Sequence, residues 1–329
     1  MNALGYTTHN VVQRMPDTSR TSWAWYAVAA GFLLCENSAA QWLYTAEVNR
    51  LGEGYVHRID LQTFSAEIVL ETTGGLRGLD VAIDSGFGYW SNVDSGTIYR
   101  SPRDDLMDAT PIVEGLVFPQ DISFSKPLNA LVWTDPGDDT IGVSTLLGGN
   151  ERVLVSGVLS SSVAVDESGG WVYFEDRTTA ERGAIKRIRL DGTGLATIID
   201  DVPTATDIAL DVGHGYVYWG SSAGFDNTGG IYRVRLDGTG FEEVYKSDIP
   251  RRDAISLAID AQNNLIYFGL ENGGAGTTEI YRVGLNGEDP TFLMGGFDLI
   301  PDMSILIPAP GGLAPLALAA LLASHRRRA

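Results

Sequence analysis

Short apolar runs separated by turn residues fill the chain from about residue 41 to residue 308. In the run ATDIALD, Ile208 and Leu210 share one side of an extended chain, and the small Ala209 lies on the other. Alternation with a period of two is typical of a β-strand, and small residues on the second side fit a strand packed between neighbours. We therefore expect the middle of the chain to be all-β.

Four such runs recur in the same order six times. The first run reads RGLDVAID, PQDISFS, SSSVAVD, ATDIALD, AISLAID and PDMSILI. The second run carries aligned aromatic residues 41 to 49 positions apart, namely Tyr44, Trp90, Trp133, Phe174, Trp219 and Phe268. Four-stranded units repeating at about 45 residues are the signature of propeller blades. The pattern predicts a six-bladed β-propeller with four-stranded blades, in which the last strand, about 302–307, closes the first blade.

The motifs VWTD, YWSN, YFED and VYWG, followed by IYR and LDG runs, resemble the YWTD repeat of the LDL-receptor class B family. The resemblance covers most of residues 41–308 and is faintest in the first copy. The third copy keeps the full WTD at 133–135 but lacks an arginine that the others share at Arg58, Arg100, Arg187, Arg233 and Arg282. The resemblance implies a six-bladed propeller with a binding or adhesive role, whose motif Trp packs between blades and whose motif Asp holds turns.

The N-terminal segment, residues 1–40, differs from the repeats. Arg14 and Arg20 precede the apolar run WAWYAVAAGFLLC, and small residues follow up to Ala40. This layout predicts a secretory signal peptide cut after Ala40, and a buried N-terminal helix is the alternative. The single cysteine, Cys35, lies in this segment, so we expect a mature protein without cysteine.

The C-terminal segment, residues 309–329, begins inside a Pro-x-Pro motif at residues 308–310. A short apolar run and a cluster of three arginines come after the motif. The run is shorter than the roughly 20 residues of a membrane-spanning helix. The segment resembles a PEP-CTERM sorting signal, although Ala309 stands where Glu is usual. The resemblance implies export, processing by an exosortase-type membrane enzyme, and an extracellular or cell-surface location with transient membrane anchoring by this segment. A weak membrane anchor held by the arginines is the alternative.

Charge narrows the range of partners. The formal net charge of the whole chain is −19. The three arginines of the tail contribute positive charge to that total, so the repeat region alone has a larger net negative charge. Such a surface repels nucleic acid and anionic membranes. We therefore expect no nucleic-acid partner, and membrane contact only through the terminal segments.

Strand order sorts the loops into two sets. Links between first and second strands, and between third and fourth strands, are tight turns such as LDGTG. Links between second and third strands are longer and varied, as in SNVDSGT and DPGDDT, and they share one end of a propeller with the links that lead into each first strand. We call this end the long-loop face. Variable loops on a rigid scaffold commonly bind ligands, so the candidate ligand-binding residues are Arg77, Asp94, Asp138, Asp139, Asp226, Arg251 and Arg252.

One position of the first strand is rich in oxygen-bearing side chains. Aligned by sequence, it reads Asp80, Asp121, Ser162, Asp207, Ser256 and Ser304. Side chains that point into the mouth of the central channel would form an all-oxygen ring suited to Ca²⁺ or Mg²⁺. The alternative is that each Asp only accepts a backbone N–H of the next blade.

Two functions follow from these features. The first is an exported, surface-associated, non-catalytic propeller that binds a protein or extracellular glycan through its long-loop face. The second is a metal-dependent lactonase or hydrolase, which requires Asp80, Asp121 and Asp207 to converge. The position one residue earlier, where related lactonase-type propellers carry metal ligands, holds no carboxylate: it reads Leu79, Gln120, Ser161, Thr206, Ile255 and Met303.

Overall fold

The structure is a computed structural model that describes residues 41–81, 86–177, 182–222, 229–273 and 275–306. All of these residues belong to one compact unit, residues 39–312. The predicted signal peptide, the predicted sorting segment and Asp226 lie outside the described residues. Within the described ranges the regular elements are 24 strands in six four-stranded antiparallel sheets, and no helix there is long and apolar enough to cross a bilayer.

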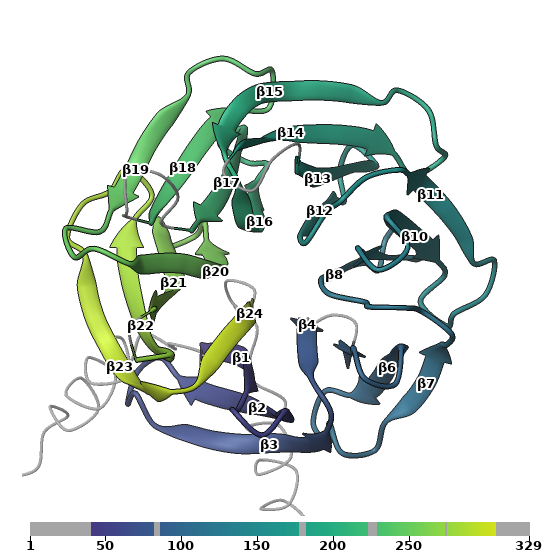
Figure 1. Ribbon diagram of the computed structural model, residues 1–329, viewed down its shortest axis with the longest axis horizontal. Coiled ribbons are helices and arrows are strands. Elements are labelled where there is room, and N and C mark those ends of the chain that lie inside the picture. Colours follow the sequence, from purple (N-terminus) through teal and green to yellow (C-terminus); the bar gives the residue numbers. More distant parts are fainter. Residues whose placement is uncertain (1–40, 82–85, 178–181, 223–228, 274, 307–329) are drawn as a thin grey trace, which may run out of the picture. The chain divides into compact units, whose positions relative to one another are not determined.

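The strands follow one another blade by blade, from the inner strand to the outer (Figure 1). Blade 1 contains β24 (Leu299–Leu306), β1 (Trp42–Val48), β2 (Glu53–Asp60) and β3 (Ala66–Thr73). Blade 2 contains β4 (Leu76–Val81), β5 (Phe87–Asn92), β6 (Thr97–Pro102) and β7 (Thr110–Val113). Blade 3 contains β8 (Ile122–Ser125), β9 (Ala130–Asp135), β10 (Thr140–Ser144) and β11 (Arg152–Ser156).

The other three blades repeat this order. Blade 4 contains β12 (Val163–Asp166), β13 (Trp171–Arg177), β14 (Arg182–Arg189) and β15 (Ala196–Pro203). Blade 5 contains β16 (Ala205–Asp211), β17 (Tyr216–Ser221), β18 (Gly230–Arg235) and β19 (Glu242–Lys246). Blade 6 contains β20 (Arg252–Asp260), β21 (Leu265–Asn272), β22 (Thr277–Gly284) and β23 (Thr291–Phe297). The prediction of an all-β, six-bladed propeller is confirmed.

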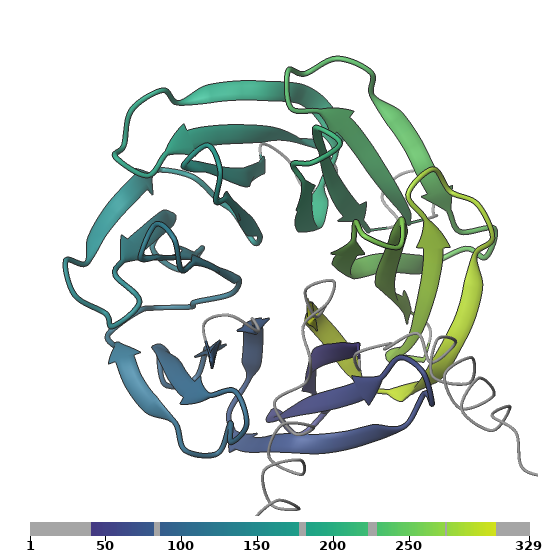
Figure 2. The same ribbon diagram turned by 180° about the vertical axis from the view of Figure 1, so that it is seen from behind.

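The first blade joins the two ends of the described chain. Strand β24 pairs antiparallel with β1, with Leu306 opposite Trp42 and Ser304 opposite Tyr44. Each inner strand contacts the inner strands of both neighbouring blades, so the ring is closed without a gap. The views from the two ends show these six strands around the centre (Figures 1 and 2). The predicted closure is confirmed, although the closing strand begins at Leu299, earlier than expected.

The hydrophobic core lies between blades. Trp219 of blade 5 is fully buried and belongs to a cluster with Ala164 and Ile185 of blade 4. Phe268 of blade 6 packs in the same way in a cluster with Tyr218 of blade 5. Because each sheet is covered on both faces by its neighbours, one blade cannot bury its own apolar residues alone. The predicted role of the motif aromatic residues is confirmed at these positions.

The arginine shared by the third strands has a structural role. Arg233 Nη1 donates to the Leu285 carbonyl of the next blade at 2.9 Å, and its guanidinium lies 4.5 Å above the ring of Tyr216. Arg187 makes the equivalent contact to the Leu236 carbonyl at 3.3 Å. Both arginines are charged donors that tie one blade to the next. These two cations are therefore occupied by the scaffold rather than offered to a ligand.

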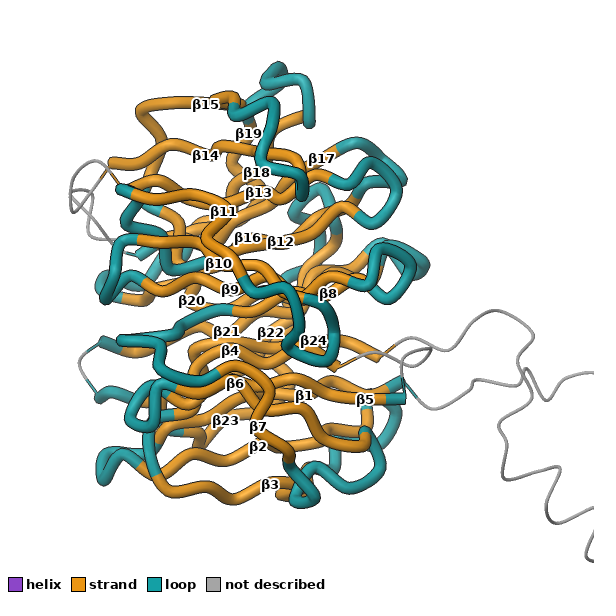
Figure 3. Tube along the Cα trace, turned by 90° about the vertical axis from the view of Figure 1, so that its right-hand side faces the viewer, coloured by secondary structure: helices purple, strands orange, loops and turns teal. Residues whose placement is uncertain are grey.

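The loops gather at the two ends of the strands, as the side view shows (Figure 3). At the tight-turn end, Asp166 Oδ1 accepts the backbone N–H groups of Ser168 and Gly169 at 2.8 and 3.0 Å. Asp211 Oδ1 likewise accepts the N–H of His214 at 3.0 Å. Short carboxylate side chains that accept nearby backbone N–H groups stabilise tight turns. These hydrogen bonds hold the two turns in place, whereas the varied sequence is at the long-loop face.

Candidate functional site

A cavity of about 190 Å³ lies at the long-loop end, where the inner strands begin. We call it the mouth pocket. Two successive positions of the inner strands supply most of its lining, and Arg177 at the end of β13 and Leu299 at the start of β24 complete it. The residues of the first position are Arg77, Gln120, Ser161, Thr206, Ile255 and Pro301, and those of the second are Asp121, Asp207 and Asp302.

The three aspartates form a carboxylate ring on alternate blades. Their side chains are at most 9% exposed. Each Oδ2 accepts a backbone N–H from the inner strand of the following blade, at 2.5 to 2.7 Å. The donors to Asp302, Asp121 and Asp207 are Leu79, Val163 and Leu257 respectively. Because a backbone N–H between two blades has no ladder partner, these carboxylates satisfy donors that would otherwise be buried unpaired.

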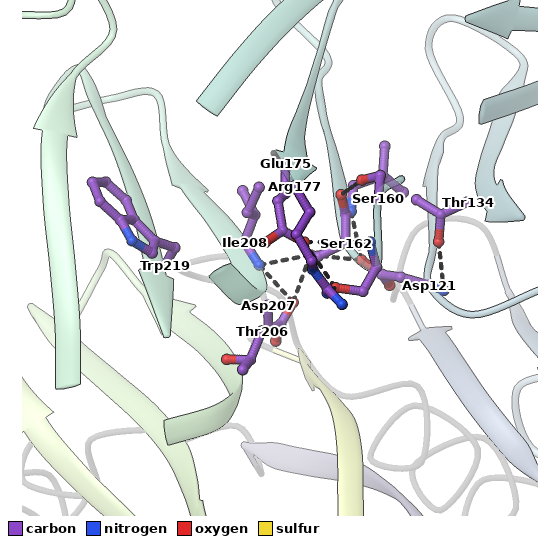
Figure 4. Close-up of polar contacts among 12 residues, drawn as sticks. Asp121, Thr134, Ser160, Ser162, Glu175, Arg177, Thr206, Asp207, Ile208 and Trp219 are labelled. Atoms are coloured by element: carbon purple, nitrogen blue, oxygen red, sulfur yellow. Dashed lines mark hydrogen bonds and ion pairs between the residues drawn. The ribbon is translucent and has the colours of Figure 1, made fainter. Parts of the chain in front are cut away.

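Small residues occupy the same strand position in the intervening blades. Ser162 Oγ lies 2.9 Å from Asp121 Oδ2 and 3.1 Å from Asp207 Oδ1, and it accepts the Ile208 N–H at 2.7 Å (Figure 4). A hydroxyl has one proton to donate, so Ser162 can serve only one of the two carboxylates at a time. In blade 2 the position is Gly78, where an added Cβ would lie 2.5 Å from the Gln120 carbonyl oxygen.

Asp80 and Ser304 lie two residues beyond the ring, contrary to the predicted alignment. Asp80 Oδ2 accepts the Phe124 N–H at 3.0 Å and Ser304 Oγ accepts the Val81 N–H at 3.2 Å, which forms a second tier of blade-to-blade contacts. The ring positions in these blades are Gly78 and Asp302. A shift of two residues keeps a strand side chain on the same face, so side-chain alternation could not reveal the error.

This correction also changes the position one residue earlier. In blades 1 and 2 it holds Pro301 and Arg77, which line the mouth pocket, rather than Met303 and Leu79. Leu79 and Met303 are buried in core clusters instead. The corrected position still contains no carboxylate.

Burial raises the pKa values of the ring carboxyls. Removal from water raises the pKa of Asp207 to about 7. For Asp121 the same cause acts first, and repulsion from Asp207 raises its pKa further. Burial followed by repulsion from Asp121 and Asp207 raises the pKa of Asp302. Because a buried carboxyl near other carboxyls resists ionisation, the ring carries less than its full negative charge near neutral pH.

The geometry gives no direct support for a metal centre. The described residues include no group of three or more His, Cys, Asp or Glu placed to hold a metal ion. Asp80 belongs to the second tier and accepts the N–H of Phe124, whereas Asp121 and Asp207 meet at Ser162. The hydrogen bonds match the alternative in which each Asp accepts a backbone N–H of the next blade. Binding of Ca²⁺ or Mg²⁺ stays a prediction.

Two arginines give the mouth pocket its hydrogen-bond donors. Arg177 Nη2 donates to Ser161 Oγ at 2.8 Å and lies 3.3 Å from Glu175 Oε2. The Nε atoms of both Arg77 and Arg177 are buried without a hydrogen-bond partner among the described residues. Burial, opposed by the charge of Asp94, lowers the pKa of Arg77. Arg77 was predicted from sequence, whereas Arg177 was not, because the aligned position, three residues after the motif aromatic, holds no arginine in the other copies.

The remaining predicted ligand-binding residues do not converge on the pocket. Arg252 is buried and forms an ion pair with Glu279 at 2.7 Å, so its charge is already satisfied within blade 6. Asp94 Oδ2 accepts the Gly75 N–H at 3.1 Å. The other described candidates are exposed in loops of the long-loop face, namely Asp138, Asp139 and Arg251.

Large apolar side chains are exposed around the same face. They lie in links that begin or end at this end of the blades, between β1 and β2, β7 and β8, β11 and β12, and β19 and β20. The residues are Leu51, Val117, Phe118, Leu159 and Ile249. Exposed apolar side chains also lie at the tight-turn end, for example Leu147 and Leu195, so these five residues count only together with the varied loops and the mouth pocket of this face. We call these five residues the apolar rim.

No family model matches the chain. A stretch of 118 residues, 34% of the chain, is 30% identical to low-density lipoprotein receptor-related protein 5 from Mus musculus. The repeat is YWTD-like. The chain spans only 7% of the length of that mouse protein, so the likeness concerns the repeat and not the whole relative.

Solved structures share the propeller fold over most of the chain. A structure of a nidogen/laminin complex matches with a TM-score of 0.65 and 17% identity, over 80% of this chain and 98% of the matched chain. A putative TolB from Agrobacterium tumefaciens matches with a TM-score of 0.62 and 13% identity, over 80% and 92% of the two chains. Likeness at these identities shows the fold alone.

The YWTD-like motif supports the carboxylate ring directly. In blade 3, where the motif is complete, Thr134 Oγ1 accepts the Asp121 N–H at 3.0 Å. Asp135 is buried and its two carboxylate oxygens accept the N–H groups of Val117 and Phe118 at 2.9 and 2.7 Å. The motif therefore fixes both a ring residue and two residues of the apolar rim, and its Asp has the predicted role of holding a loop.

Proposed function

We propose that this protein is an exported, surface-associated, non-catalytic propeller that binds a protein or glycan partner through its long-loop face. The supporting observation is the coincidence of three features at that face. The apolar rim lies in four of its links, the varied loops are there, and the mouth pocket is at the same end. Binding commonly resides in loops positioned by a rigid scaffold.

The chemistry of the rim favours a protein over a glycan. Four of its five members are aliphatic, and Phe118 is the one aromatic residue. Protein interfaces combine apolar side chains at the centre with polar groups at the edge. The similar structure of a nidogen/laminin complex is an assembly of two proteins, and this supports a binding role for the same architecture here.

The terminal segments support the export part of the proposal. Residues 1–40 would direct secretion and be removed, and residues 309–329 would be handled by an exosortase-type membrane enzyme. The propeller would then act outside the cell or at its surface. Its net negative charge repels nucleic acid, so a partner of another class is expected.

Crosslinking on intact cells of the native host tests the binding part. The long-loop variant Val117→Arg/Ile249→Arg places two charges in the apolar rim, where both side chains are about half exposed. The matched variant Leu147→Arg/Leu195→Arg places two charges at exposed positions of the tight-turn end. We expect the long-loop variant to lose the crosslinked partners and the tight-turn variant to keep them. Equal crosslinking by both variants and the wild type would contradict the proposal.

A further inference from the structure

Two arginines line the mouth pocket beside the ring carboxylates, whose oxygens already accept hydrogen bonds. The Oδ2 atom of each ring carboxylate is occupied by a backbone N–H, and Ser162 lies between Asp121 and Asp207. The hydroxyl of Thr206 donates to the Ala254 carbonyl. In contrast, Arg77 lines the pocket and its guanidinium has no hydrogen-bond partner among the described residues. Its buried Nε is not distinctive, because those of Arg100, Arg187 and Arg252 are unpaired as well. A guest that completes these hydrogen bonds has to supply acceptor oxygens.

Charge points to the same kind of guest. Arg177 is partly balanced by Glu175, whose side chain is 1% exposed and already contacts both Arg177 and Ser161. Arg77 has no carboxylate within ion-pair distance among the described residues, and Asp94 acts on it only through space. Burial raises the pKa values of the ring carboxyls of Asp121, Asp207 and Asp302, so these groups carry less negative charge and repel an anionic guest less. Arginine remains charged in proteins and binds carboxylates with two parallel hydrogen bonds.

The size of the pocket limits the guest. Its volume of about 190 Å³ is below the range of roughly 300 to 1,000 Å³ found for sites that enclose whole small molecules. One side chain of a larger partner fits this scale better than a free metabolite. A peptide carries aliphatic groups on either side of an inserted side chain. These groups would match the exposed side chains of the apolar rim.

We propose that the mouth pocket receives the carboxylate of an Asp or Glu side chain from a protein partner, with Arg77 as its principal contact and Arg177 as its second. This inference rests on the proposed function, because it assigns the anchor point of the same binding face. The partner segment lies across the apolar rim and inserts one acidic residue at the axis. Buried arginine–carboxylate contacts of this kind anchor protein interfaces.

A selection from a phage-displayed library of random peptides, with the full-length chain as bait, tests the proposal. Selected peptides are synthesised, and each Asp or Glu is replaced in turn by Asn or Gln. We expect one acidic residue whose replacement weakens binding about tenfold or more, because a charged hydrogen bond is lost. Arg77→Gln should weaken binding by a similar factor, and the two changes together should cost little more than either alone.

Controls separate this effect from a fold defect and from a general charge effect. Arg251→Gln removes an exposed arginine of the same face that does not line the pocket, and we expect unchanged binding. Arg77→Lys keeps the charge but loses the paired geometry, so an intermediate affinity is expected. The thermal midpoint of each variant confirms that the propeller is folded. Methyl glucuronide, a carboxylate borne by a sugar, is the competitor that identifies a uronic acid guest.

The outcomes distinguish the two proposals. Peptides that lose binding to Val117→Arg/Ile249→Arg but ignore Arg77→Gln would overturn the carboxylate pocket and leave the binding face intact. Peptides insensitive to both variants, or no binding peptides at all, would count against both proposals. If methyl glucuronide displaces the selected peptides, and those peptides need no acidic residue, the guest of the pocket is the carboxylate of a sugar and not that of a protein.

Discussion

The carboxylate of Asp302 accepts the backbone N–H of Leu79 at 2.6 Å, across 223 residues of sequence. Asp302 belongs to the closing strand β24, whereas Leu79 lies in β4 of the second blade. This contact therefore ties the last strand of the propeller to a blade beyond the one it completes. The same bond recurs from Asp121 to blade 4 and from Asp207 to blade 6, so the ring is a repeated fastening of blade to blade.

Asp302→Ala should lower the free energy of unfolding by about 1 to 3 kcal/mol, because the Leu79 N–H is left buried without an acceptor. Asp302→Asn keeps an acceptor oxygen and should cost less than about 1 kcal/mol. Urea unfolding measures the stability of both variants. Asp138→Ala, at an exposed loop residue, is the control. Equal stability of the Ala and Asn variants would show that the bond contributes nothing.

The stability of the propeller should fall as the pH rises through the carboxyl window. The pKa of Asp207 is raised from 3.8 to about 7 in the folded state, so between these values the folded protein holds a proton that the unfolded chain has released. Linkage then lowers the free energy of unfolding with rising pH, and the loss is complete above about pH 7. Calorimetry between pH 4 and pH 8 should show that wild type loses stability relative to Asp207→Asn. A pH-independent difference between the two proteins would refute this.

Gly142→Ala should destabilise blade 3. An added Cβ at Gly142 would lie 2.2 Å from the Trp133 indole, and overpacking of a filled core costs about 1 to 3 kcal/mol. Gly213→Ala is a matched control, because its nearest neighbour would be 3.6 Å away and its backbone is not in the left-handed region. The thermal midpoint should drop for the first variant and stay near wild type for the second. A midpoint unchanged by Gly142→Ala would show that Trp133 moves aside freely.

Sequencing of the secreted protein should find Gln41 at its N-terminus, because the signal peptide is predicted to end at Ala40. Deletion of residues 309–329 should release the propeller into the medium, where an antibody assay of cells and medium measures it. A protein that starts at Met1 would contradict the predicted cleavage. A truncated chain that stays with the cells would contradict the role assigned to the tail.

The blade pattern was predictable because two independent periods agree. Alternation within a strand identified buried strands such as 205–211, and the spacing of the aromatic residues identified the blades. Closure by the last strand was predictable from the order of the strands. The repeats begin at the second strand of a blade and end on a first strand, so the last strand completes the first blade. Local signals were sufficient for these features because every blade solves the same packing problem.

The composition of the site was only partly predictable, for reasons that differ by residue. Asp302 was missed because a two-residue shift within a strand leaves the buried face unchanged. The pairing of Arg252 could not be seen from sequence, because its partner Glu279 lies 27 residues later on β22, which β21 separates from β20 in the sheet. The position of Arg177 holds no arginine in the other copies, so the repeat pattern does not select it. Packing between blades determines which charges are left for a ligand, and that is a property of the assembled ring.

Strand β24 begins at the long-loop face and ends at the tight-turn end, where Leu306 lies opposite Trp42. Both ends of the described chain are therefore on the side away from the mouth pocket. A tether attached beyond Leu306 would leave the propeller from its back and hold the mouth pocket and apolar rim outward. The route of one closing strand thus sets the direction in which a surface-held propeller would face its surroundings.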